Sequence, residues 1–188
     1  MTHINIILTY LFPFVIAAGY FSVCLSNTRS GKPLKSGISL KAALLFGASA
    51  SAMLLAGYYA AGLLENRVED AEKWVVMVML LLIGYRMIMH GWRKRASVKV
   101  FDINLTSVIL AMSFALGING LFAGVALNFL DIPFQRVAWL TGATVFFFSF
   151  SGLLYGRQFG SKTGYILEII AGLGFIVAAF TWYAQQVL

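Results

Sequence analysis

Two polar side chains stand inside long apolar stretches and have the chemistry to bind a cation. Glu168 offers a carboxylate six residues after Lys162, and Asn119 offers an amide oxygen near the centre of another stretch. Oxygen ligands of this kind suit hard divalent cations. Asn119 and Glu168 are therefore candidate metal ligands. The structural alternatives are an interhelical hydrogen bond for Asn119 and an ion pair near the membrane surface for Glu168.

Hydroxyl and small residues could complete a path for a solute. Ser22, Ser49 and Thr144 are candidate lining residues, although hydroxyls often bond to their own helix backbone. Runs of small residues around Ala50 and at Gly117, Gly120 and Gly124 favour close helix packing, or unwinding that exposes backbone carbonyls.

Two further polar residues lie near the end of an apolar stretch. We expect Arg86 to extend toward the membrane surface, with His90 at the same level. The sequence contains no His-rich metal motif, no phosphate-binding glycine loop and no nucleophile–base pair. It therefore predicts that the chain is not an enzyme.

The elements that must position these residues are transmembrane helices. Sixty per cent of the 188 residues are hydrophobic and 11% are charged, far fewer than the quarter or so typical of soluble domains. Each of six apolar stretches is near or above the length that spans a bilayer. They are 4–26, 42–64, 74–92, 105–130, 138–156 and 164–185. The predicted fold class is an all-α integral membrane protein with six transmembrane helices.

The basic residues are distributed unevenly between the two sides of such a bundle. One side would carry eleven Lys or Arg residues and the other three, at 67, 73 and 136. The positive-inside rule predicts that the eleven face the cytoplasm and that both termini lie outside it. Because the basic residues cluster at helix ends, the net charge of +7 indicates topology and not a nucleic-acid partner.

The two halves of the sequence resemble each other. Phe46-Gly47-Ala48 with Gly57 matches Thr141-Gly142-Ala143 with Gly152 at a constant offset of 95. Three spans per half would give two inverted three-helix repeats, 1–100 and 101–188, within one membrane domain. We expect their interface to involve the first, second, fourth and fifth helices.

The segment from Trp74 to Arg93, with Ile83-Gly84-Tyr85-Arg86-Met87 at its centre, resembles the manganese efflux pump family. So do Ala42–Leu64, Gly152-x-x-x-Gly156-Arg157 and Glu168-Ile-Ile-Ala-Gly-Leu173. The family belongs to the lysine-exporter-like transporters. The resemblance covers nearly the whole chain and implies export of divalent manganese across the inner membrane.

The chain departs from that family at positions that would bind the cation. The family carries an Asp in its first helix and another in its fourth, and these positions hold Gly19 and Asn119 here. A polar amide of the second helix falls on Ala50, and a nearby proline falls on Leu54. Losing two carboxylates removes charge that would offset the desolvation of a divalent ion.

These observations predict a small secondary transporter of the manganese efflux type that works by alternating access. Its substrate path would include Gly19, Ser22, Ser49, Ala50, Asn119, Thr144 and Glu168. The cargo is manganese, another ion or a neutral solute; the alternative is a transport-inactive homologue that serves as a membrane subunit or assembly partner. We expect no resident cofactor, a bacterial inner-membrane location, and contact with lipid, a small ion or solute, and a second copy or a membrane partner protein.

Overall fold

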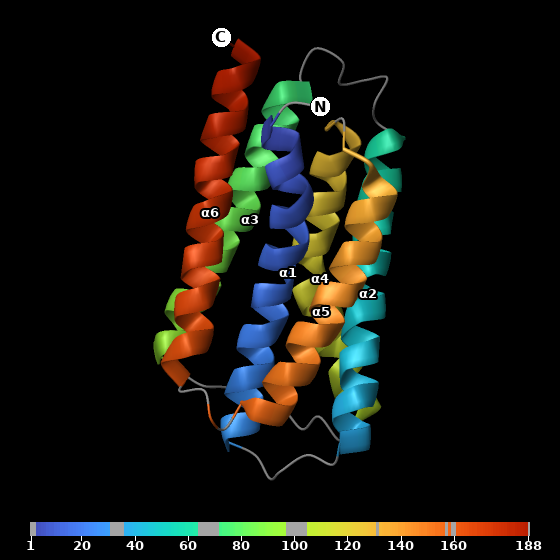
Figure 1. Ribbon diagram of the computed structural model, residues 1–188, viewed down its shortest axis with the longest axis vertical. Coiled ribbons are helices and arrows are strands. Elements are labelled where there is room, and N and C mark those ends of the chain that lie inside the picture. The colour runs from blue at the N-terminus through green and yellow to red at the C-terminus, as the bar shows by residue number, and fades with distance from the viewer. Residues whose placement is uncertain are drawn as a thin grey trace.

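The computed structural model describes residues 3–30, 36–63, 72–96, 105–130, 132–156, 158 and 161–187. These residues form six long helices arranged as an upright bundle (Figure 1). The helices are α1 (His3–Ser30), α2 (Ser36–Gly62), α3 (Glu72–Ala96), α4 (Thr106–Asn128), α5 (Phe134–Tyr155) and α6 (Ser161–Val187).

Every one of these helices contains a segment long and apolar enough to cross a membrane. The prediction of six spans in an all-α membrane protein is thereby confirmed. Two helices begin a full turn or more before their apolar stretches, α2 at Ser36 and α5 at Phe134. Their first turns hold polar residues such as Arg136, which apolarity alone does not assign to the helix.

The six helices pack in a closed ring, in the order α1, α5, α2, α4, α3, α6 and back to α1. α1 packs against α5 and α6, α2 against α4 and α5, and α3 against α6 and α4, while α1 and α4 also touch. The same set of contacting pairs results when α1 is exchanged with α4, α2 with α5 and α3 with α6. The first helix of each half therefore packs mainly against helices of the other half.

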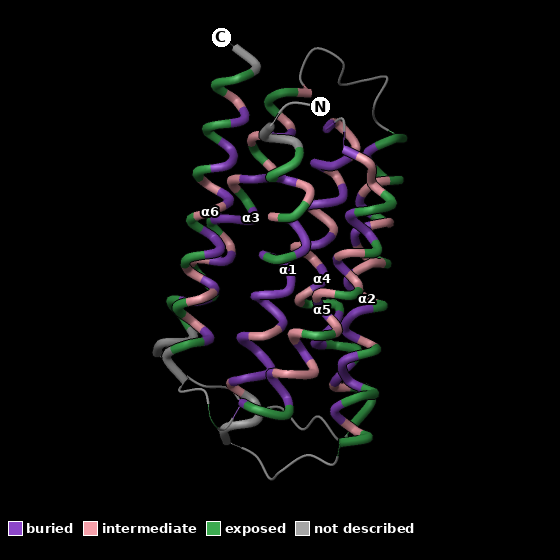
Figure 2. The backbone as a smooth tube through the Cα atoms, in the orientation of Figure 1, coloured by how far each residue is buried: buried purple, intermediate pink, exposed green. Residues whose placement is uncertain are grey.

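Burial is greatest along α1, as the purple tube in Figure 2 shows. Of its membrane segment 67% is buried, against 33–39% in the other five. In the core, Phe12 of α1 packs against Phe175 of α6, and Tyr20 of α1 packs against Phe46 of α2. Large apolar side chains on the outside, such as Trp139, are exposed, as expected for helices that face lipid.

Glycines let three helix pairs approach closely. A Cβ on Gly47 of α2 would lie 2.8 Å from the carbonyl oxygen of Gly142 of α5. In the α3–α6 pair, a Cβ on Gly84 would lie 2.8 Å from the carbonyl oxygen of Gly172. A Cβ on Gly172 would likewise lie 2.8 Å from the carbonyl oxygen of Gly84. At the α2–α4 contact, a Cβ on Gly120 would lie 3.2 Å from the oxygen of Ala50. The small residues of α2 and α4 therefore serve close packing, one of the two roles predicted for them.

Candidate functional site

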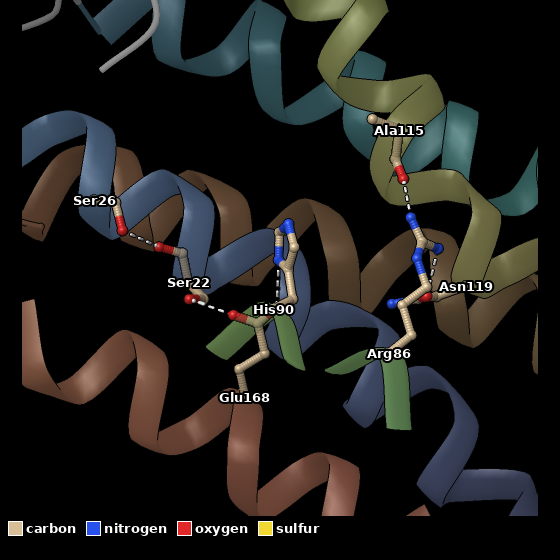
Figure 3. Close-up of polar contacts among 7 residues, drawn as sticks. All are labelled: Ser22, Ser26, Arg86, His90, Ala115, Asn119 and Glu168. Carbon is tan, nitrogen blue, oxygen red and sulfur yellow. Dashed lines mark hydrogen bonds and ion pairs between the residues drawn. The ribbon is translucent and has the colours of Figure 1, made fainter. Parts of the chain in front are cut away.

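Glu168 is a buried carboxylate held by two helices besides its own. The residue is 2% exposed, and its Oε2 accepts a hydrogen bond of 2.9 Å from the Oγ of Ser22 on α1. Its Oε1 lies 2.9 Å from Nδ1 of His90 on α3. Figure 3 shows this cluster, in which Ser26 also donates to the backbone oxygen of Ser22. The cluster ties α1, α3 and α6 together around a single acidic group.

Arg86 forms a second cluster with α4. Its Nη1 donates to the amide oxygen of Asn119 at 2.7 Å, and its Nη2 donates to the backbone oxygen of Ala115 at 2.9 Å (Figure 3). Both acceptors are neutral. Arg86 was expected to extend toward the membrane surface, but its guanidinium instead donates hydrogen bonds to two oxygens of α4.

The two clusters line one cavity of about 150 Å³. Its lining residues are Val23, Arg86, His90, Met112, Ala115, Leu116, Asn119 and Glu168. They belong to α1, α3, α4 and α6, whereas the sequence pointed to the first, second, fourth and fifth helices. The cavity therefore combines one carboxylate, one permanent cation, one imidazole and one amide with apolar walls.

Helical spacing explains why these side chains converge. Arg86 and His90 are four residues apart on α3, and Ala115 and Asn119 are four apart on α4. Residues at this spacing lie on one face of a helix, so each pair points to the same side. The geometry of the site follows from which faces α3 and α4 turn toward each other.

Asn119 and Glu168, the two candidate metal ligands, both line this cavity. Each already has a partner, because the Asn119 oxygen accepts from Arg86 and the Glu168 carboxylate contacts Ser22 and His90. Within the described ranges, no group of three or more His, Cys, Asp or Glu residues is placed to hold a metal ion. A cation entering here would have to displace these contacts.

Gly19 of α1 does not line the cavity, but there is open space at its position. The residue is buried, yet a Cβ added to it would meet no atom within 4 Å. It precedes the lining residue Val23 by four positions and shares its helix face. The position could therefore accept a larger side chain on the helix face that it shares with Val23.

The remaining predicted path residues lie elsewhere. Ser49 bonds to the backbone of Phe46 in its own helix, and Ala50 is fully buried in the α2–α4 contact. Thr144 bonds to Leu140 of its own helix at 2.7 Å and to Pro13 of α1 at 3.3 Å. The structure does not bring these three residues to the cavity.

Sequence reasoning did not include Arg86 and His90 among the path residues. The available signal was their polarity at a spacing of four within an apolar helix. Polar groups at membrane depth are costly and are usually paired or functional. Their position near the end of the stretch instead suggested simple surface contact.

Comparison of the sequence with known proteins identifies a family. The family described as "Putative manganese efflux pump" matches residues 34–182. A protein named putative manganese efflux pump MntP from Crocosphaera subtropica is 31% identical over 162 residues, 86% of each chain.

Two further relatives carry the same name. The protein from Methanosarcina acetivorans is 27% identical over 158 residues, 84% of each chain. The protein from Methylobacillus flagellatus is 28% identical over 171 residues, 90% of each chain. No solved structure matches the chain. On the family match and these relatives, the chain belongs to the manganese efflux pump family of membrane transporters.

Proposed function

We propose that the protein is a secondary transporter that moves a small ion through the cavity between α1, α3, α4 and α6 by alternating access. The observation that carries this proposal is the buried Glu168 at the cavity wall. An acidic group in a membrane span is costly to keep, and such residues commonly mark ion pathways. Its contacts with Ser22 and His90 hold it ready for exchange with an incoming charged group.

The packing of the helices supports an alternating mechanism. The pairs of contacting helices map onto themselves when the two halves are exchanged, as an inverted three-helix repeat would require. The hydrogen bonds from Arg86 to Asn119 and Ala115 join α3 of one half to α4 of the other. Movement of the halves against each other would break these bonds, so they belong to one of two alternating states.

Divalent manganese is the cargo suggested by the names of the relatives. The charges of the cavity favour a change from that cargo. Glu168 is the one described carboxylate among its lining residues, and Arg86 brings a permanent positive charge into the same space. A divalent cation would meet one negative and one positive group, so a monovalent ion suits the cavity better.

Flux measurements in sealed vesicles that contain the purified protein test this proposal. We expect transport of manganese or of another small ion that depends on Asn119 and Glu168. The Asn119→Ala variant should lower the flux, and Thr181→Val, which alters an exposed hydroxyl on α6, should leave it unchanged. Equal flux for wild-type vesicles and protein-free vesicles, with all tested divalent cations, monovalent ions and protons, would contradict it.

The second candidate is a transport-inactive membrane subunit. It is favoured by the absence of a side chain at Gly19 and by the occupation of the Asn119 oxygen by Arg86. This candidate predicts a partner protein that co-purifies in fixed stoichiometry and no ion flux. Dependence of any flux on Asn119 would exclude it.

We also propose a location in the inner membrane of a bacterial cell with both termini outside the cytoplasm. The excess of basic residues at the end of the bundle that holds Arg93 supports this orientation. The opposite end carries both termini (Figure 1). Labelling of cysteines added at each terminus in intact cells tests the orientation.

A further inference from the structure

A second, larger hollow lies on the outer side of Arg86 and His90. This groove between α3 and α4 has a volume of about 330 Å³ and is lined by Leu82, Tyr85, Arg86, Met89, His90, Arg93 and Phe122. Arg86 and His90 also line the inner cavity, so they form the wall between the two spaces. Tyr85 and Leu82 are exposed, which indicates that the groove opens on the lipid-facing surface of the bundle.

The groove holds two permanent positive charges, on Arg86 and Arg93, and between them His90, whose Nδ1 contacts Glu168 on the inner side. Arg86, His90 and Arg93 follow each other at spacings of four and three residues, so all three lie along one face of α3. None of the described residues that line the groove is acidic. Only two of the five N–H donors of Arg86 are used by Asn119 and Ala115. An occupant of this groove should therefore be an anion.

Depth along the groove sets further limits on the occupant. Arg93 ends the membrane segment of α3, and its neighbour Trp92 is 67% exposed, as expected for a residue at the membrane–water interface. Arg86 is seven residues deeper, about 10 Å at the rise of an α-helix. Leu82 is one turn deeper again, beside the apolar Phe122 of α4. The groove thus changes from charged at the interface to apolar within the membrane.

We propose that this groove binds one acidic phospholipid. The phosphate lies at Arg93, the ester oxygens lie at the level of His90 and Arg86, and an acyl chain follows Leu82, Tyr85 and Phe122. Basic pockets between transmembrane helices bind anionic headgroups in this manner. The inference goes beyond transport and does not depend on the cargo. A bound lipid would cover the outer wall of the cavity and hold α3 and α4 together where the two helices meet.

Native mass spectrometry of the purified full-length protein tests this site. The protein is first equilibrated in nanodiscs with equal amounts of phosphatidylglycerol and phosphatidylcholine. We expect the released wild type to retain one phosphatidylglycerol in preference to phosphatidylcholine. Arg93→Gln should lower that preference about five-fold, since one basic residue near an anionic surface contributes at this level. Arg136→Gln removes an exposed charge at the start of α5, outside the groove, and should leave the preference unchanged.

A third variant distinguishes lipid binding in the groove from general attraction of anionic lipid to a basic surface. Met89→Trp keeps all three basic groups and fills the groove, so it should also lower lipid retention. Size-exclusion chromatography of each variant shows that it remains folded. Equal loss in Arg93→Gln and Arg136→Gln, or full retention in Met89→Trp, would overturn the proposal. If the groove shows no preference for phosphatidylglycerol and inorganic phosphate displaces the bound lipid, the groove is a site for small anions, and the proposal is overturned as well.

Discussion

Arg86 on α3 donates a hydrogen bond of 2.7 Å to the amide oxygen of Asn119 on α4, and the two residues lie 33 positions apart in the chain. The bond pairs a permanent cation within a membrane segment with a neutral acceptor. It also joins a helix of the first half to one of the second.

Asn119→Leu should destabilise the protein. Leucine has a similar branched shape but no acceptor, so the charged Arg86 guanidinium loses a hydrogen bond, at a cost of about 1–3 kcal/mol. Asn119→Asp should retain or raise stability, because a carboxylate would pair with the guanidinium. Thermal unfolding in detergent, followed by size-exclusion chromatography, measures both. An Asn119→Leu protein that unfolds at the wild-type temperature would show that the bond contributes nothing to the folded state.

Gly19→Asp should fold and should increase binding of manganese. The Cβ of the new residue meets no atom within 4 Å, and the position shares a helix face with the cavity residue Val23. The new carboxylate would supply charge that the cavity lacks for a divalent ion. A rise in melting temperature on addition of manganese measures binding.

Gly174→Asp is the matched control for this gain. A Cβ at Gly174 is also free of contacts, but Gly174 is six residues from Glu168, the cavity residue of its helix, and so lies on another helix face. Its melting temperature should not respond to manganese more than that of the wild type. The same response in both variants would mean that the added charge acts from the surface, and the assignment of the new carboxylate to the cavity would fail.

Glu168→Gln should abolish flux while the protein stays folded. The amide keeps the volume of the side chain and can still accept from Ser22, so packing is preserved. The negative charge at the cavity is lost, and with it the attraction for a cation. Glu72→Gln, a change in the first turn of α3 and outside the cavity, serves as the control. Flux at the wild-type level in Glu168→Gln would remove this residue from the path.

Gly47→Val should destabilise the α2–α5 contact. A Cβ at this position lies 2.8 Å from the Gly142 oxygen and 3.3 Å from the Cβ of Phe146, so the helices must separate. Overpacking of this kind costs about 1–3 kcal/mol. Gly37→Val, where a Cβ is free of contacts within 4 Å, controls for the general effect of the substitution. Thermal unfolding of the two variants should differ in this direction.

The number of helices could be predicted from the sequence because the bilayer imposes a minimum apolar length. The face that each helix turns toward the core could not be predicted in this way. In a membrane the core and the lipid are both apolar, so a helix such as α5 carries little pattern that distinguishes its buried face from its outer face. Ala50 was placed in the path by the family resemblance and Thr144 by its hydroxyl, and both lie in helix contacts instead.

The candidate site was predicted in part for a related reason. Asn119 and Glu168 stood out because polar groups are rare in such segments, and both line the cavity. Their partners Arg86 and Ser22 lie 33 and 146 positions away. Only the packing of α3 against α4 and of α1 against α6 determines those contacts, and no local pattern contains it.

The pairing of α1 with α5 and α6 has a consequence for biogenesis. During synthesis α1 enters the membrane first, but its main partners are the last two helices to be made. Until they arrive, Ser22 has no Glu168 to bond, and the most buried helix of the finished protein is surrounded by lipid or by the insertion machinery. A nascent chain that stops after α3 would lack these partners. Quality control during insertion therefore acts on a chain whose first helix stays unassembled until translation is nearly complete.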